Sequence, residues 1–287
     1  MPAACNQPAV WGEPLLAHIT LHDDLRIYYE FIDGDGDLPC LVFLHEGLGC
    51  AAMWKHFPRR LCRLTGCAGL VYDRLGYGGS SPAAAPRTVH YLHAYALQEL
   101  PRVIAALIPE RPIVLVGHSD GGTIALLHGA ERPPHLAGII TEAAHVFVES
   151  VTLDGIRAAV TAFENGRLSG LAKYHGERSQ AVFRAWSATW LSDWFADWNI
   201  EYALPAISAP LLVIQGREDQ YATERQVQAI VTRSGGPATP ALIDRCGHVP
   251  HLEQPEAVLQ LMSRFIKAAS SPSSTMPPNR PQAAGPC

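Results

Sequence analysis

Short apolar segments alternate with longer amphipathic segments along most of the chain. The short runs are bounded by glycine, proline or charged residues and lie at 41–44, 69–72, 113–116, 138–141, 211–214 and 241–243. Such runs are typical of strands buried on both faces of a parallel sheet. Thr20 and residues 25–31 resemble a leading hairpin.

Segments with helical spacing of apolar residues lie between the predicted strands, at 53–64, 89–107, 123–130, 225–232 and 256–268. Pro255 stands near the start of the last segment, where the missing N–H of proline does no harm. Strands that alternate with helices predict an α/β domain, with a mostly parallel sheet and helices on both of its faces.

Residues 147–205 interrupt this alternation, because they show helical spacing and no convincing strand. We interpret them as a helical cap inserted into one core domain, which comprises residues 15–146 and 206–268. Residues 269–287 are rich in Ser, Pro and Ala, so we expect them to be disordered.

The composition excludes several classes of protein. Of the 287 residues, 48% are hydrophobic and 17% are charged, unlike a collagen, a coiled coil or a mainly disordered chain. The net charge of −5, without a basic run, argues against nucleic acid as a partner. No segment approaches the roughly 20 apolar residues that span a membrane. The seven cysteines lack zinc-ligand spacing, so we expect neither a disulfide framework nor a metal site.

The N-terminus lacks the charged region of an export signal, since the first basic residue is Arg26. We therefore expect a cytoplasmic protein. The sequence is compatible with a monomer or a homodimer.

A candidate nucleophile stands in Gly117-His118-Ser119-Asp120-Gly121, between a predicted strand and a predicted helix. The pattern G-x-S-x-G at such a turn is typical of a nucleophilic serine, whose hydroxyl the strained turn exposes. Glycine is expected at both ends, because a side chain there would meet the neighbouring strand and helix. The alternative is an ordinary glycine-rich turn, with His118 as a packing residue.

A serine hydroxyl needs a general base that is itself oriented by a carboxylate. In this architecture the chain order is Ser, acid, His. Asp219 and His248 each follow a predicted strand, so both are expected at the same edge of the sheet as Ser119. The competing residues for these two roles are His251, Glu218 and Asp244.

Acyl transfer also needs two backbone N–H groups that bind the oxyanion. One is expected at Asp120, directly after the serine. The other is expected in the turn-forming loop 45–49, His-Glu-Gly-Leu-Gly, where we choose Gly47.

Taken in order, these segments resemble the α/β-hydrolase family in its capped branch, from about residue 15 to residue 266. The motifs that carry the resemblance are His45-x-Gly47, Asp73-Arg74-Leu75-Gly76-Tyr77-Gly78-Gly79-Ser80, Gly-x-Ser119-x-Gly, Asp219 and Gly247-His248. The resemblance implies the α/β-hydrolase fold, a Ser119, Asp219 and His248 triad, and no cofactor or metal.

The stretch Ser119-Asp120-Gly121-Gly122 is similar to esterases of the biphenyl-hydrolase-like and valacyclovir-hydrolase-like group. The chain departs from the family at Glu46, where the family typically has glycine. This departure places a carboxyl group beside the oxyanion loop. We therefore consider Glu46 a substrate-binding candidate, which together with the Asp120 side chain favours neutral or amine-bearing esters. The alternative is that the Asp120 carboxylate is held by a local hydrogen bond.

Tryptophan recurs at every fourth residue of the predicted cap, at Trp186, Trp190, Trp194 and Trp198. This spacing predicts that the four side chains share one side of one helix. They either pack that helix against the core or form an aromatic wall, for which Trp186, Trp190 and Trp194 are the substrate-binding candidates.

The most consistent hypothesis is a serine hydrolase that cleaves a small carboxylic ester through an acyl-enzyme. A lactonase, a thioesterase or a C–C bond hydrolase would use the same serine. A nucleotide-binding dehydrogenase is an alternative, because Gly47-x-Gly49-x-x-Ala52 matches a loose dinucleotide fingerprint and Asp73 follows the next strand. A further alternative is a binding scaffold, a protein that keeps this fold but catalyses no reaction.

Overall fold

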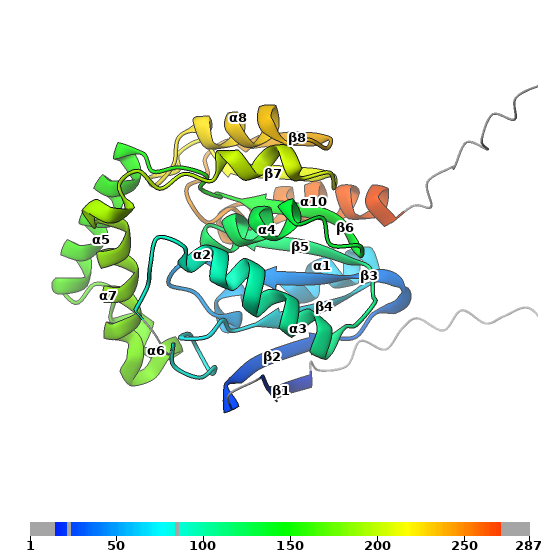
Figure 1. The fold of residues 1–287 in the computed structure, drawn as a ribbon, viewed down its shortest axis with the longest axis horizontal. Coiled ribbons are helices and arrows are strands. Elements are labelled where there is room, and N and C mark those ends of the chain that lie inside the picture. The colour runs from blue at the N-terminus through cyan, green and yellow to red at the C-terminus, as the bar shows by residue number, and fades with distance from the viewer. Residues whose placement is uncertain (1–14, 22–23, 84–85, 271–287) are drawn as a thin grey trace, which may run out of the picture.

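The computed structural model describes residues 15–21, 24–83 and 86–270, and its centre is a sheet with helices on both faces (Figure 1). The sheet has eight strands in the order β1-β2-β4-β3-β5-β6-β7-β8. Strand β2 is antiparallel to both of its neighbours, and all other neighbours are parallel. The strands are β1 (Leu15–Thr20), β2 (Arg26–Ile32), β3 (Asp35–Leu44), β4 (Cys67–Tyr72), β5 (Ile113–His118), β6 (Leu136–Glu142), β7 (Leu211–Gly216) and β8 (Ala238–Ile243).

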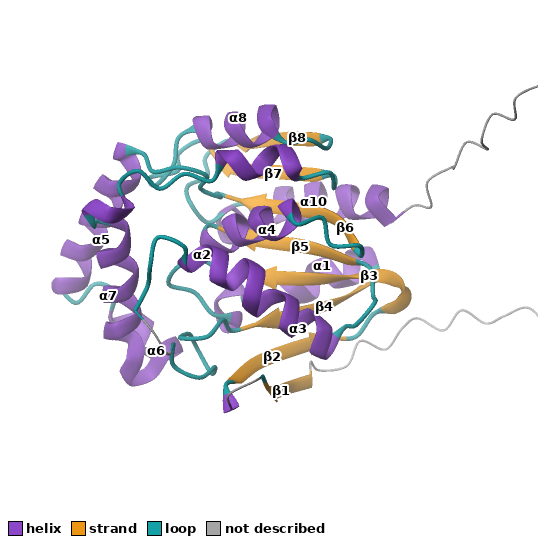
Figure 2. Cartoon of the chain, viewed as in Figure 1, coloured by secondary structure: helices purple, strands orange, loops and turns teal. Residues whose placement is uncertain are grey.

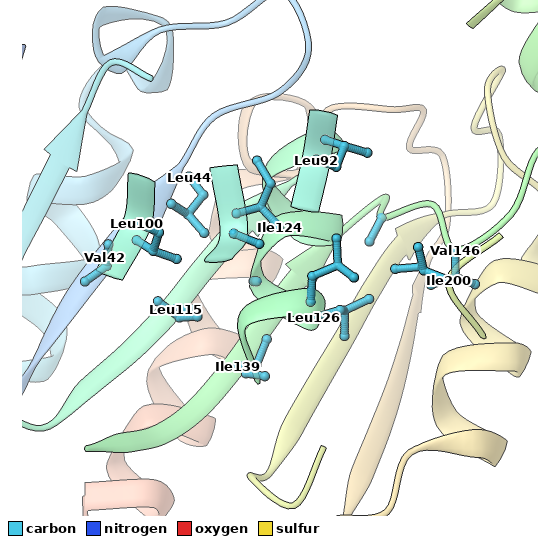
Figure 3. Packing of buried hydrophobic residues seen from close by; sticks show 14 of the residues in the cluster. Val42, Leu44, Leu92, Leu100, Leu115, Ile124, Leu126, Ile139, Val146 and Ile200 are labelled. Carbon is cyan, nitrogen blue, oxygen red and sulfur yellow. The ribbon is translucent and has the colours of Figure 1, made fainter. Parts of the chain in front are cut away.

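The α-helices are α1 (Phe57–Thr65), α2 (Tyr91–Ala94), α3 (Leu100–Leu107), α4 (Asp120–Ala130), α5 (Ser150–Glu164), α6 (Ala172–His175), α7 (Ser179–Trp190), α8 (Glu224–Arg233), α9 (Pro250–Glu253) and α10 (Pro255–Ser270). Successive side chains of each strand point to opposite faces of the sheet, so each face has its own core. On one face, Val42 and Leu44 pack with Ile124 of α4 (Figure 3). On the other, Leu41 and Phe43 pack with residues of α1 and α10. The predicted α/β fold class is therefore confirmed.

The structure refines several predicted boundaries. The segment 53–64 is divided, because the positive φ of Lys55 separates a 3₁₀ turn from α1. The segment 89–107 is continuous but contains a π-helical turn, Tyr95–Glu99, between α2 and α3. Helix α10 extends to Ser270, so the first two residues of the predicted disordered tail are helical. The rest of that tail, residues 1–14 and the predicted hairpin turn at 22–23 lie outside the described residues.

The segment 147–205, here called the helical segment, contains α5, α6 and α7 and no strand. Its two ends lie side by side, because Phe147 and Asn199 form an antiparallel β-bridge. Figure 2 shows these helices beyond the arrowheads of the parallel strands. The helical segment therefore stands over the carboxyl ends of the strands, where open α/β sheets hold their sites.

Glu99 is a carboxyl group inside the core of the domain. It is 6% exposed, and its Oε2 accepts a hydrogen bond from the Leu75 N–H at 3.0 Å. Burial raises the pKa of Glu99 to about 7, although the Leu75 hydrogen bond and the Arg74 charge oppose this shift. The native state therefore holds this proton more tightly than the unfolded chain does.

Because the folded pKa is raised, the contribution of Glu99 to stability falls as the pH rises from its ordinary value of 4.5 to about 7. Glu99→Gln removes this dependence. Relative to the wild type, the free energy of unfolding of the variant is expected to rise by about 3 kcal/mol between pH 4.5 and pH 8. Urea denaturation at both pH values measures it. The same change in the exposed Glu164→Gln variant, or no change in Glu99→Gln, would contradict the assignment.

Candidate active site

Ser119 lies at the turn between β5 and α4 in a strained backbone conformation. Its φ of +52° and ψ of −116° fall in a region that residues with a side chain rarely adopt. The Ser119 N–H donates to the carbonyl oxygen of Glu142 at 2.8 Å, and the Ser119 carbonyl oxygen accepts from the Thr123 N–H at 3.0 Å. These hydrogen bonds hold the turn against its strain.

The two glycines of the motif are required by the close approach of neighbouring backbone. A Cβ added to Gly117 would lie 2.2 Å from the carbonyl oxygen of Gly121. A Cβ added to Gly121 would lie 1.9 Å from the carbonyl oxygen of Leu44, at the end of β3. The sharp turn can form only if both positions lack a side chain, as the sequence pattern predicts.

His248 is hydrogen-bonded to Asp219 at the same edge of the sheet. Its Nδ1 lies 2.9 Å from Asp219 Oδ1 and 3.0 Å from Oδ2. The Asp219 side chain is fully buried, and that of His248 is 10% exposed. Burial would raise the pKa of Asp219, but the interactions with His248 and the hydrogen bond from the Tyr221 N–H lower it below its ordinary value. Asp219 is therefore an anion that accepts the Nδ1–H of His248.

The competing residues are occupied elsewhere. The Nδ1 of His251 lies 2.6 Å from Oε2 of the buried Glu142. The Asp244 side chain is 81% exposed and pairs with Arg217, and Glu218 is exposed. The geometry therefore favours His248 and Asp219 over their competitors.

A cavity of about 290 Å³ opens beside Ser119 and His248. It is lined by Glu46, Gly47, Leu48, Met53, His118, Ser119, Asp120, His145, Thr152, Ile156, Leu168, Leu171, Trp186, Trp190, Gln220, Tyr221, His248 and Val249. Within the described part of the chain, no hydrogen bond joins the Ser119 hydroxyl to the His248 ring, and the two side chains share this cavity instead. Catalytic hydrogen bonds of this kind often tighten only when substrate is bound.

The loop after β3 is held by the buried Arg74. Its Nη2 donates to the carbonyl oxygens of His45 at 3.2 Å and Glu46 at 2.8 Å. The next residue, Gly47, lines the cavity together with Asp120. Asp120 is the first residue of α4, so its N–H has no partner within the helix. The structure thus brings both predicted oxyanion donors to the cavity.

The two carboxyl groups predicted beside the site are both paired. The Asp120 Oδ2 accepts a hydrogen bond from the Tyr91 hydroxyl at 3.1 Å and lies 3.9 Å from Arg74 Nη1. Glu46 Oε2 lies 3.6 Å from His118 Nδ1. The structure therefore favours local pairing of these carboxylates over the expected attraction for amine-bearing substrates.

Two of the four tryptophans line the cavity, and they come from α7. The expectation of one continuous helix does not hold, because α7 ends at Trp190 and a separate 3₁₀ turn, Asp193–Phe195, follows. Trp186 and Trp190 line the cavity. Trp194 is 51% exposed and lies outside that lining, so its predicted contact with substrate is not supported. Trp198 is buried and packs on the core.

His118, His145 and Tyr221 also line the cavity, although no sequence motif predicted this contribution. His145 Nε2 donates to the carbonyl oxygen of Tyr221 at 3.1 Å, and burial lowers the pKa of His145. The Tyr221 ring lies 4.7 Å from the His248 ring. One available signal was position, since His145 follows strand β6 as Ser119 follows β5.

A larger cavity of about 570 Å³ lies beyond Tyr91. Tyr91 lines it and also donates to Asp120, so this tyrosine stands between the two cavities. Arg87 and Arg178 are among the polar residues of the larger cavity. None of its described lining residues belongs to the candidate triad, so the chemistry is assigned to the smaller cavity.

The glycine-rich loop after β3 does not form a dinucleotide site. A Cβ added to Gly49 would lie 2.1 Å from Glu46 Oε2, so the Glu46 carboxylate fills the space beside this glycine. Asp73, the acidic partner in the fingerprint, instead accepts the N–H groups of Ala51 and Gly79, each at 2.6 Å. These contacts argue against the dehydrogenase alternative.

A sequence profile of the alpha/beta hydrolase family matches residues 41–261. The chain belongs to the alpha/beta hydrolase family. The matched residues of this hydrolase include the Ser119 turn, Asp219 and His248.

Several relatives of this hydrolase are distant from it in sequence. Monoglyceride lipase from Rattus norvegicus is 21% identical over 260 residues, which cover 84% of this chain and 86% of that protein. The 2-succinyl-6-hydroxy-2,4-cyclohexadiene-1-carboxylate synthase of Salmonella paratyphi B is 24% identical over 276 residues, covering 85% and 100%. The structure of a thermophilic esterase from Thermogutta terrifontis has a TM-score of 0.66 at 22% identity, covering 91% and 100%. That structure supports the fold alone, and similarity to the biphenyl-hydrolase-like group stays a prediction.

None of the helices in the described residues combines the length and apolar character needed to cross a membrane. The same residues contain no group of three or more His, Cys, Asp or Glu side chains that could hold a metal ion. The cysteines that the structure describes are buried and unpaired; they are Cys40, Cys50, Cys62, Cys67 and Cys246.

Proposed function

We propose that this hydrolase cleaves a small carboxylic ester through a covalent acyl-enzyme on Ser119. The observation that supports it is the placement of two groups on one cavity: Ser119 at a strained turn, and His248 bound to the buried Asp219. A hydroxyl beside a base that a third group orients is the arrangement of an activated nucleophile.

In the first half-reaction, His248 Nε2 takes the hydroxyl proton as Ser119 Oγ attacks the ester carbonyl carbon. Asp219 accepts the Nδ1–H, keeps the imidazole in the productive tautomer and stabilises the imidazolium. The imidazolium then protonates the leaving alcohol oxygen. In the second half-reaction, His248 deprotonates a water molecule, which attacks the acyl carbon. The imidazolium then returns the proton to Ser119 Oγ as the bond between the acyl carbon and Oγ breaks and the acid leaves.

The N–H groups of Gly47 and Asp120 serve as the oxyanion donors in this mechanism. Both residues line the cavity beside Ser119. The partial positive charge at the N-terminus of α4 adds to the field at Asp120. Loss of a single donor of this type raises the activation barrier by about 3 kcal/mol, so the loop geometry is a large part of the catalytic power.

The helical segment acts as a cap over a core of residues 15–146 and 206–268. Its side chains Thr152, Ile156, Leu168, Leu171, Trp186 and Trp190 form one wall of the cavity. Most of these side chains are apolar, and they face the loops that carry Ser119 and His248. Substrate would therefore enter between the helical segment and the core.

A small, neutral, largely apolar ester fits this cavity best. The cavity volume of about 290 Å³ is at the lower end of the range for small-molecule sites. Glu46 pairs with an imidazole and Asp120 with a tyrosine hydroxyl and a guanidinium, so neither offers an unpaired charge to a substrate.

Steady-state hydrolysis of matched 4-nitrophenyl esters, a thioester and a lactone tests this proposal. We expect the highest kcat/KM for the acetate or butyrate ester. Because a C–C bond hydrolase would use the same serine, the panel also includes a β-diketone as a C–C bond substrate. Faster turnover of the thioester, lactone or diketone would assign this hydrolase to one of the alternative reactions. Absence of any turnover would support the binding scaffold.

Trp186→Ala is expected to move the acyl preference toward longer chains. The Cδ1 of the indole lies 2.5 Å from where a Cβ on Gly47 would stand, so the ring closes the cavity above that loop. Removing it should raise the ratio of kcat/KM for hexanoate to that for acetate by about tenfold, the scale of hydrophobic pocket contacts. Trp194→Ala is the matched control, because Trp194 is 51% exposed. An equal shift in both variants would contradict the placement of Trp186.

A further inference from the structure

A partly buried ion pair lies beside the proposed base. Glu46 Oε2 is 3.6 Å from His118 Nδ1, and His118 Nε2 is 2.7 Å from the backbone carbonyl oxygen of His248. The His118 side chain is 1% exposed and that of Glu46 is 22% exposed. His118 immediately precedes Ser119. The pair therefore connects the loop after β3, the end of β5 and the loop that carries His248.

The partners of the His118 ring define its protonation. A carbonyl oxygen only accepts, so Nε2 carries a proton and donates it to His248. Burial alone would lower the pKa of His118, but the Glu46 carboxylate outweighs it and raises the pKa. Burial would likewise raise the pKa of Glu46, but His118 and His45 lower it to about 2. Both ring nitrogens of His118 thus face acceptor oxygens, which favours the imidazolium form of His118 beside the Glu46 carboxylate.

Other titratable groups also surround the His118 ring. The His248 and His251 rings lie 5.2 Å and 5.1 Å from it. The Glu142 carboxylate, which is bound to His251 Nδ1 at 2.6 Å, adds to the rise in the pKa of His118. Glu142 at the carboxyl end of β6 and Glu46 in the loop after β3 thus both favour the charged form of His118.

The Glu46 carboxylate has a dedicated place in the structure. A Cβ on Gly49 would lie 2.1 Å from Glu46 Oε2, so glycine at this position makes room for the carboxylate. The main chain of Glu46 is held separately by Arg74. These contacts direct the Glu46 carboxylate toward His118. This placement differs from the substrate-binding role that the sequence led us to expect for Glu46.

We propose that Glu46 and His118 are positioning residues, whose ion pair holds the backbone carbonyl of His248 and so fixes the imidazole relative to the Ser119 hydroxyl. This inference rests on the proposed function, in which His248 is the base. Asp219 holds the ring and His118 holds the main chain, so His248 is fixed at two points. Since His118 is joined to Ser119 by a peptide bond, the hydrogen bond from His118 to the His248 carbonyl fixes the base relative to the nucleophile.

The test compares His118→Phe, His118→Gln and Glu46→Gln with the wild type on a neutral 4-nitrophenyl ester and its α-amino analogue. Phenylalanine keeps the ring packing and removes both nitrogens, whereas glutamine retains an N–H near the Nε2 position. We expect His118→Phe to lower kcat by about 10- to 100-fold, with KM changed by less than about threefold. His118→Gln should lie within about fivefold of the wild type, and Glu46→Gln should lose about three- to tenfold.

Two further measurements separate positioning from folding. Fluorophosphonate titration normalises each rate to the fraction of reactive serine, and His135→Gln, at an exposed histidine, controls for histidine replacement. Nitrogen-15 NMR of the imidazole rings measures the protonation of the His118 nitrogens and does not depend on turnover. We expect His118 to carry both protons at pH 7 in the wild type and to lose the Nδ1 proton in Glu46→Gln. The NMR result and the Glu46→Gln rate stand even if His118→Phe does not fold.

Unchanged kcat in the folded variants, or a neutral His118 in the wild type, would overturn the positioning role. A change in KM confined to the amino ester would assign Glu46 to substrate binding instead. A wild type that neither labels nor hydrolyses esters contradicts the proposed function itself. A wild type that labels, with variants that match its kcat, contradicts only this inference.

Discussion

Replacing Ser119 by alanine is expected to lower kcat for an aryl ester by at least about 10⁴-fold while the protein stays folded. The reason is the loss of the only group that forms the acyl bond in the proposed mechanism. The hydroxyl takes no part in the backbone hydrogen bonds that hold the turn. Turnover of 4-nitrophenyl butyrate and thermal unfolding of the same preparation measure both effects.

Ser119→Gly is the matched variant for this experiment. It removes the same hydroxyl and also relieves the backbone strain at φ +52°. We expect it to be as inactive as Ser119→Ala and more stable than that variant by about 1 kcal/mol. Residual activity above about 1% of the wild type in both variants would assign the chemistry to another group.

Asp219→Asn is expected to lower kcat by about 10³- to 10⁴-fold with little change in KM. The Asp219 Oδ1 accepts the Tyr221 N–H at 2.8 Å, so the amide oxygen of asparagine is expected to take that place. Its NH₂ group would then stand at the Oδ2 position, 3.0 Å from His248 Nδ1. A donor there requires an unprotonated Nδ1, which puts the proton on Nε2 and removes the base.

The competing carboxylates supply the controls. Glu218→Gln changes the exposed acidic residue directly before Asp219, and Asp244→Asn changes an exposed acidic residue four positions before His248. We expect both to keep kcat within about twofold of the wild type. A large loss in either control, with an active Asp219→Asn, would show that the base is oriented differently.

Much of the fold could be predicted because it depends on local pattern. The strands at 41–44 and 113–116 are apolar on both faces, and the structure buries them in two cores. The glycines around Ser119 mark a turn whose geometry excludes a Cβ. Each of Ser119, Asp219 and His248 follows a predicted parallel strand. The carboxyl ends of such strands share one edge of a sheet, so the sequence also predicts that the three side chains lie close together.

Other features depend on contacts between distant segments, which spacing alone does not encode. Tryptophans at every fourth residue predict a single helix, but the chain leaves α7 at Trp190 and turns Trp194 toward solvent. Glu46 lies in the loop after β3, and His118 is the last residue of β5. Their pairing follows from the adjacency of β3 and β5 in the sheet, so the sequence alone suggested a substrate contact for one and simple packing for the other.

Reaction of the wild-type protein with a fluorophosphonate, followed by mass spectrometry of its peptides, tests the central claim most directly. An activated serine attacks the phosphorus and displaces fluoride, which leaves a stable adduct. We predict one adduct per chain, located on Ser119, and none in Ser119→Ala. A folded wild-type protein that stays unmodified, or an adduct on another residue, would contradict the account.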